Sequence, residues 1–155
     1  MDQIQDKSPH FPTVEDIKNH KEVMQKIALV VIWYERNGWS APLSMLMEAR
    51  DKLSAHAVYL GQIVAGFVGD ADRAEFERKM QEIDNFHSLV SRGEGVTAAS
   101  NFCKDKSKRE IEIKANKSKE EARLLLSQSN KVLDALQQRI SYEKIDLEKR
   151  NNNQV

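Results

Sequence analysis

Histidine is the side chain best suited to acid–base chemistry near neutral pH, and the sequence has four of them. They stand at His10, His20, His56 and His87, so no two lie three or four residues apart. A zinc-binding pair presented by one helix needs that spacing, and the sequence has no HExxH motif. His20 and His87 fall on apolar faces of predicted helices. We therefore interpret them as packing residues rather than as metal ligands or bases.

The single cysteine and the glycines offer no better chemistry. One cysteine, Cys103, excludes an internal disulfide and a site built from several thiolates. As a nucleophile it would need a positioned base, and the sequence identifies none. Gly61 and Gly66 have the spacing of the outer glycines of a phosphate-binding loop, but Phe67 follows where that loop carries lysine. We expect a protein that is not an enzyme, with no catalytic residue, no cofactor and no bound metal.

The richest polar feature is the stretch from residue 104 to residue 123, which we call the basic segment. It holds eight basic and five acidic side chains. Cations repeated along one helix can neutralise the phosphates of a nucleic acid. The acids between them favour a solvated helix face with ion pairs one turn apart, and Phe102 is the one aromatic residue near enough for base stacking. Nucleic-acid binding stays an alternative, with candidate contacts at Lys104, Lys106, Lys108, Arg109, Lys114 and Lys117.

Composition indicates that helices position these residues. The 155 residues include only six glycines and three prolines, too few for the turns of a sandwich or barrel, and 31% of them are charged. A net charge of zero argues against a uniformly basic nucleic-acid binder. The longest apolar run, 27–34, is far shorter than the roughly 20 residues of a membrane span, and no apolar stretch of a signal peptide follows the first methionine. We predict an all-α protein without a membrane span.

The apolar spacing predicts one helical domain over residues 13–150. Helices are expected at 13–37, 41–68, 71–90 and 97–150, with Gly69 and Asp70 separating the second from the third. Residues 1–12 are expected to form a flexible arm and residues 151–155 a disordered tail. The fold class that follows is a long antiparallel helical hairpin or coiled coil with a short middle helix.

Heptad spacing along two of these helices predicts an interface between copies. Residues 97–150 contain neither glycine nor proline, and so long a helix must pair with other helices in this chain or in copies of it. Residues 1–96 carry 11 basic and 15 acidic side chains and residues 97–155 carry 13 and 9, a division that favours docking within the chain or between copies. We predict an oligomerisation seam that consists of Leu46, Leu53, Leu60, Leu126, Leu133, Leu136, Ile140 and Leu147.

Five short stretches have counterparts in a known family. They are the apolar residues 28–34 with 23–25 before them, residues 47–52, and residues 114–116 and 130–137 near the C-terminus. These stretches resemble the filament and tip proteins of type III secretion systems, the EspA/SseB-like sheath subunits. The resemblance implies a coiled-coil hairpin that polymerises outside the cell and is kept soluble inside it by a secretion chaperone.

Other stretches are similar to a second family. Residues 43–76, with Glu48 and Gly69, and residues 133–136 with Arg139 resemble phage recombination mediators, which load recombinase on single-stranded DNA. We expect a non-catalytic, self-assembling helical protein, a filament or tip subunit of a secretion apparatus that is secreted without a cleaved signal peptide. The alternative is an oligomeric, cytoplasmic phage recombination mediator that binds single-stranded DNA through the basic segment.

Overall fold

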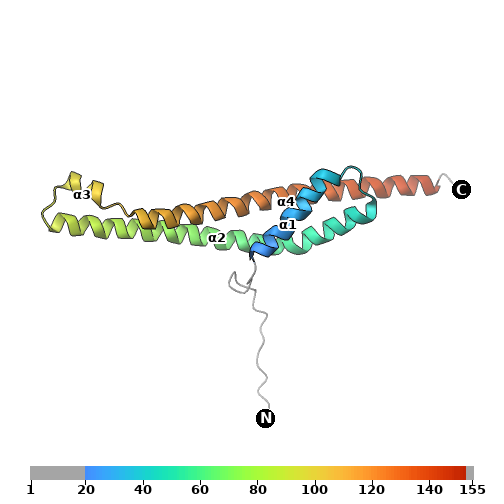
Figure 1. Cartoon of the computed structure of the whole chain (residues 1–155). Helices are drawn as coiled ribbons and strands as arrows, with labels where there is room; N and C mark the ends of the chain where they lie inside the picture. The colour runs from blue at the N-terminus through green and yellow to red at the C-terminus, as the bar shows by residue number, and fades with distance from the viewer. Residues whose placement is uncertain (1–19, 153–155) are drawn as a thin grey trace, which may run out of the picture.

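The computed structural model describes residues 20–152. Within them the chain forms four helices and no strand, namely α1 (His20–Asn37), α2 (Leu43–Ser91), α3 (Val96–Phe102) and α4 (Lys106–Asn152). The predicted all-α hairpin with a short helix is confirmed. Helices α2 and α4 lie side by side and run in opposite directions, with α3 at the end where the chain turns back (Figure 1). At 1.5 Å per residue, the 49 residues of α2 make a rod about 70 Å long.

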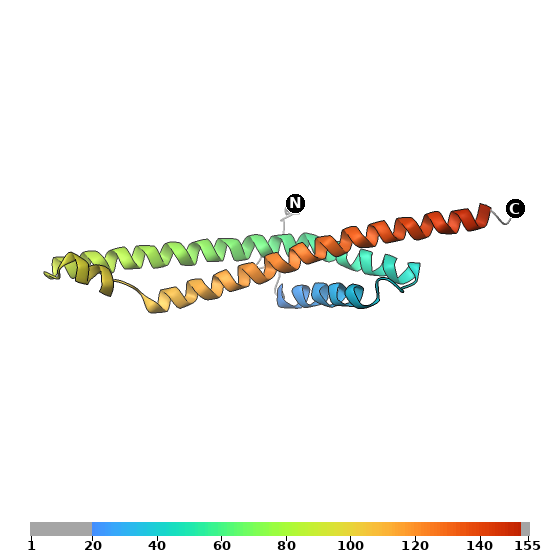
Figure 2. The ribbon, with the colours of Figure 1, turned by 90° about the horizontal axis from the view of Figure 1, so that it is seen from above.

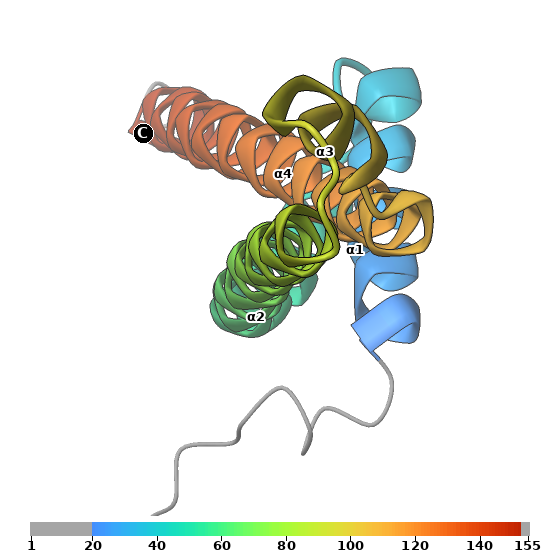
Figure 3. The same ribbon diagram turned by 90° about the vertical axis from the view of Figure 1, so that its left-hand side faces the viewer.

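Helix α1 divides this hairpin into two halves. It packs against both α2 and α4, at the end of the rod away from α3 (Figure 2). Seen along the rod, α1 lies on one side of the other two helices and runs obliquely across them (Figure 3). We call α1 with residues 43–69 and 118–152 the three-helix half. Residues 70–91, α3 and residues 106–117 form the two-helix half.

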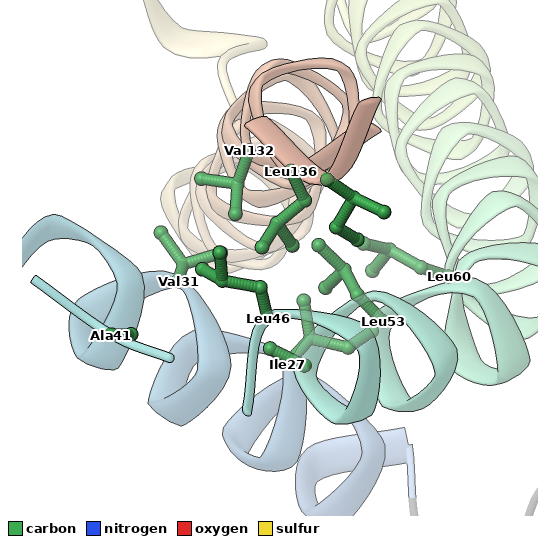
Figure 4. Packing of buried hydrophobic residues seen from close by; sticks show 10 residues of the cluster. Ile27, Val31, Ala41, Leu46, Leu53, Leu60, Val132 and Leu136 are labelled. Atoms are coloured by element: carbon green, nitrogen blue, oxygen red, sulfur yellow. The ribbon is translucent and has the colours of Figure 1, made fainter. Parts of the chain in front are cut away.

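The hydrophobic core lies in the three-helix half. Ile27 of α1, Leu46, Leu53 and Leu60 of α2, and Leu136 of α4 are fully buried, and Figure 4 shows them converging between the three helices. Burying an aliphatic side chain of this size contributes about 1.5–3 kcal/mol. Helix α1 therefore covers the face that two helices alone would leave open. The other buried members of the core are Val31, Ala41, Ala49, Val132 and Ile140.

Small side chains and ion pairs join the helices of the two-helix half. Ala71 and Ala74 of α2 are buried, so no large side chain separates the helices there. Two ion pairs connect α2 to α4 at this level, Arg78–Glu112 at 2.5 Å and Lys108–Glu77 at 3.1 Å. No buried member of the core cluster described above belongs to this half. These contacts fix which faces of the helices meet, with little apolar burial.

The predicted break at Gly69 and Asp70 is wrong, because α2 continues through both residues. A glycine inside a helix costs only about 1 kcal/mol relative to alanine, and the burial of Ala71 and Ala74 on the next turn offsets that cost. Residues 71–90 are therefore the second part of α2. The short helix of the fold is α3, which lies at the turn of the hairpin.

The predicted helix 97–150 is also divided, between α3 and α4. Its division has a local cause, since the backbone N–H of Lys108 donates to Asp105 Oδ1 at 2.9 Å and Asp105 thereby caps α4. At the other end α4 includes Asn151 and Asn152, which were predicted to belong to the tail. The predictions for residues 1–12, 13–19 and 153–155 fall outside the described part of the chain.

Two glycines are required by the turns around α2. A Cβ atom on Gly38 would lie 2.6 Å from ring carbons of Tyr34, so only glycine lets the chain leave α1 this closely. Gly93 follows α2 with φ of 91°, a conformation that other residues rarely adopt. Each glycine therefore directs the chain toward its next helix.

Candidate interaction surfaces

The predicted oligomerisation seam is largely buried inside the single chain. Leu46, Leu53, Leu60, Leu136 and Ile140 belong to its own core, so they have no free surface to offer another copy. Their neighbours are supplied within the hairpin by α2 pairing with α4, and by α1. Leu126 and Leu133 are half-buried against the same core, whereas Leu147 is 45% exposed. The spacing correctly indicated helix pairing, but seven of the eight residues pack within the chain, five of them buried.

A second apolar row on α2 remains exposed. We call Phe76, Met80, Ile83, His87 and Val90 the outer seam. Their spacings are four, three, four and three residues, which is the spacing of a coiled-coil interface. The exposed fractions are 64% for Phe76, 44% for Met80, 48% for Ile83 and 38% for Val90, and His87 is exposed as well. The outer seam therefore has the spacing of a surface that packs against another helix, but no helix within residues 20–152 covers it.

Contacts on the opposite face of α2 hold the outer seam outward. Arg78 donates from Nε to Glu112 of α4 and from Nη1 to Glu82 at 2.7 Å, and all three side chains are largely buried. The hydrogen bond to Glu112 raises the pKa of Arg78. Phe76 and Met80 each lie two residues from Arg78, about 160° away around the helix. Because Arg78 faces α4, these two residues face away from it.

Many large apolar side chains lie on the surface of this thin molecule. Among residues 20–152, eighteen large apolar side chains are exposed, twice the nine that are buried. A soluble monomer commonly exposes single apolar residues, but contiguous apolar rows mark interaction sites. Near the start of α2, Leu29, Val30, Trp33 and Met45 line a groove between α1 and α2. Near the C-terminal end of α4, Tyr142, Ile145 and Leu147 are exposed.

The structure separates the candidate cations of the basic segment into two groups. Lys108 pairs with Glu77 at 3.1 Å, and Lys117 lies 3.9 Å from Glu121. The other four are exposed and have no ion pair within residues 20–152; they are Lys104, Lys106, Arg109 and Lys114. Helix geometry places Lys106, Arg109 and Lys117 within about 80° of one another on α4. Lys106 and Lys117 lie on the side of the helix opposite Lys108, which faces α2.

The residues considered for catalysis are not assembled into one site. His20 packs edge-on against Phe67, with ring centroids 5.4 Å apart, and His56 lies half-buried on α2. Cys103 Sγ donates to the backbone oxygen of Ser100 at 3.3 Å. Gly61 and Gly66 lie inside α2 rather than in a phosphate-binding loop. His10 falls outside the described residues.

The described helices hold neither a metal-binding cluster nor a membrane-spanning segment. Across residues 20–152, no three histidine, cysteine or acidic side chains gather closely enough to hold a metal ion. None of the helices in that range combines the length and apolarity that crossing a bilayer requires.

The sequence already contained the signal that distinguishes the outer seam from the core. Phe76 follows Leu60 by 16 residues, which is about 160° of rotation in a continuous helix. The two apolar rows therefore lie on nearly opposite faces of α2 and need two different partners. The predicted break at Gly69 assigned these rows to separate helices, so their phases were not comparable.

Comparison with known proteins adds no relative. None of the protein families, curated proteins or solved structures compared with this chain matches it.

Proposed function

We propose that this protein is a non-catalytic helical subunit that assembles with further copies of itself. The observation that carries the proposal is the excess of exposed over buried large apolar side chains on the hairpin. Fully burying one such side chain is worth about 1.5–3 kcal/mol, so association offers a stabilisation that the single chain leaves unused. The specific form we propose is a filament or tip subunit of a secretion apparatus with a secretion chaperone as its partner, and it rests on the family resemblance.

The surface that would assemble differs from the one predicted from sequence. An aspartate in place of Ile140 would disrupt the chain's own core, because that side chain is buried. Loss of oligomers in such a variant would therefore report unfolding rather than a broken interface. Assembly has to use exposed residues, and the test has to change only those.

The test measures the mass of the purified full chain over a wide concentration range. Sedimentation velocity and light scattering from about 1 to 200 µM should give a weight-average mass that rises with concentration, and negative-stain imaging shows whether the product is a filament or a closed particle. Far-UV circular dichroism at each concentration confirms that the helices persist. A constant mass of one chain over this range would refute self-assembly.

A second candidate function is binding of single-stranded nucleic acid by the basic segment. It is favoured by Lys104, Lys106, Arg109 and Lys114, whose charges are exposed and unpaired within residues 20–152. Cations not paired with carboxylates can displace counterions from phosphates without first breaking a contact. Phage recombination mediators, the second family that the sequence resembles, would use such a surface.

This second candidate is tested with a fluorescein-labelled 30-nucleotide strand. Fluorescence anisotropy at about 50 mM salt should show binding that weakens steeply as salt rises. Combined Lys106→Glu, Arg109→Glu and Lys117→Glu substitutions should abolish that binding. Lys144→Glu with Lys149→Glu, two exposed cations later in the same helix, should change it little. A flat titration of the unmodified protein removes this candidate.

A further inference from the structure

We propose that the outer seam pairs with the outer seam of a second copy as a parallel, two-stranded coiled coil. This inference rests on the proposed self-assembly and assigns it to one surface. The outer seam is a sharper candidate than the other exposed apolar residues because its members follow one regular pattern. A second helix with the same spacing can contact every member of the row.

The outer seam fits the core positions of two heptads. Phe76, Ile83 and Val90 are seven residues apart and occupy d positions, while Met80 and His87 occupy the a positions between them. The inner face of the same part of α2 is occupied, because Ala71, Ala74 and Arg78 face α4. A coiled coil on the outer face would therefore leave the hairpin intact.

Other segments of the described chain leave the outer seam open. Helix α1 lies in the three-helix half, and α4 takes the opposite face of α2. The chain around Cys103 borders the row, since Cys103 lines a shallow groove with Phe86, Ile83 and His87. Ile83 and His87 nevertheless stay exposed. The occupant that we propose is the same helix from another copy.

The flanking charges select a parallel arrangement. In a parallel pair, a g residue meets the e residue five positions later on the partner, so Lys79 of each copy, which pairs with Glu75 of its own helix at 2.5 Å, also meets Asp84 of the other. In an antiparallel pair the e positions face each other, and Asp84 would meet Glu77 or another Asp84. The parallel pair also brings Asp72 of one copy near Glu77 of the other, and both are acidic. This repulsion is weak, because Asp72 lies before the first apolar layer and Lys108 already pairs with Glu77. Two attractive pairs therefore favour the parallel dimer.

The length of the row sets the strength of the pairing. Four apolar layers and one histidine layer over 15 residues bury less than the ~1,200 Å² at the lower end of standard protein interfaces. Pairing through this surface alone is therefore concentration-dependent, with both monomer and dimer measurable by sedimentation. Polar layers weaken such pairs, so replacing His87 by isoleucine, which suits a positions of parallel dimers, should strengthen the dimer about tenfold.

The first experiment compares two isoleucines that are both exposed. Ile83→Glu places a charge in the outer seam, and Ile113→Glu makes the same change on α4, where Ile113 is 61% exposed. Sedimentation velocity should show that Ile83→Glu raises the dimer dissociation constant at least tenfold while Ile113→Glu leaves it unchanged. Met80→Glu gives a second test of the outer seam, in the neighbouring layer, if Ile83→Glu does not fold. Unchanged circular dichroism in each variant separates lost pairing from lost folding.

The second experiment tests direction by exchanging charges. Asp84→Lys should weaken the dimer about threefold to tenfold, because it brings two lysines together in the parallel pair, and adding Lys79→Glu should restore it. An antiparallel pair in which Asp84 meets Glu77 predicts the opposite response to Asp84→Lys alone. An antiparallel pair in which Asp84 meets Asp84 predicts an unchanged dimer, because two lysines replace two aspartates. A stronger or unchanged dimer in Asp84→Lys therefore overturns the parallel arrangement.

The outcomes also separate this inference from the proposed function. If Ile113→Glu dissolves the assembly and Ile83→Glu does not, self-assembly stands and the outer seam is not its surface. If the unmodified protein is a monomer at every concentration, both proposals fail.

Discussion

Replacing Leu136 by alanine tests whether the heptad row of α4 serves the chain itself or its copies. Leu136 is fully buried between α1, α2 and α4 (Figure 4). Truncating a leucine at such a site costs about 2–5 kcal/mol, because the transfer free energy is lost and a cavity remains. For a chain of this size, 1 kcal/mol corresponds to roughly 2–4 °C in Tm, so we expect a decrease of about 6–12 °C for a middle value near 3 kcal/mol.

The matched control is Leu147→Ala in the same helix. Leu147 is 45% exposed, so its truncation should change the free energy of unfolding by less than about 1 kcal/mol. Both variants are measured by urea denaturation, followed by circular dichroism, at several protein concentrations. The loss caused by Leu136→Ala should be the same at every concentration, because the contacts are within one chain. A loss of stability in Leu136→Ala that grows with protein concentration would refute the assignment of Leu136 to the core of the single chain. Equal losses of stability in Leu136→Ala and Leu147→Ala would refute it as well.

Three further predictions concern local structure. Gly69→Ala should raise the free energy of unfolding by about 0.5–1 kcal/mol, because the added methyl group meets nothing within 4 Å in the middle of α2. Gly38→Ala should lower it, because the added methyl group would lie too close to the Tyr34 ring. Thermal unfolding of the two variants gives the sign of each change. Asp105→Ala should lower the free energy of unfolding, measured by urea denaturation, by about 1 kcal/mol because the cap of α4 is lost. Asp105→Asn should retain most of the stability that the cap provides, because asparagine also caps helices. Equal losses in both variants would contradict capping. The hydrogen bond from Lys79 holds the pKa of Glu75 below its ordinary value. The stability that this pair contributes is therefore fully present at pH values above the ordinary pKa of glutamate, and it is lost as the pH falls through the lowered pKa of Glu75. An NMR titration of the Glu75 carboxyl should show that Lys79→Met raises this pKa, and no change would contradict the assignment.

Periodicity predicted the helices better than it predicted their partners. The rows through Leu46, Leu53 and Leu60 and through Leu136 and Ile140 indicated a hairpin, and α2 and α4 form one. The same spacing suits a partner from this chain or from a copy, because a heptad row specifies only that another helix packs on it. Only the arrangement of all three helices showed that the core rows are satisfied internally.

Local signals misplaced the helix ends for physical reasons. Gly69 and Asp70 have the residue types of a helix end and a cap, yet the packing of Ala71 and Ala74 on α4 continues the helix. Conversely, no glycine or proline marks the end of α3, and the cap by Asp105 determines where α4 begins. Tertiary contacts and one side-chain hydrogen bond thus outweighed the preferences of single residues.

The uneven distribution of the core has a consequence for how the molecule opens. Amide groups around Leu53 and Leu136 should exchange with solvent only through global unfolding, whereas amides of residues 70–117 should exchange through cheaper, partial opening that begins at α3. Any partner that covers α2 in this region would slow that exchange without touching the core. Deuterium uptake by residues 70–117 therefore reports whether a partner covers this part of α2.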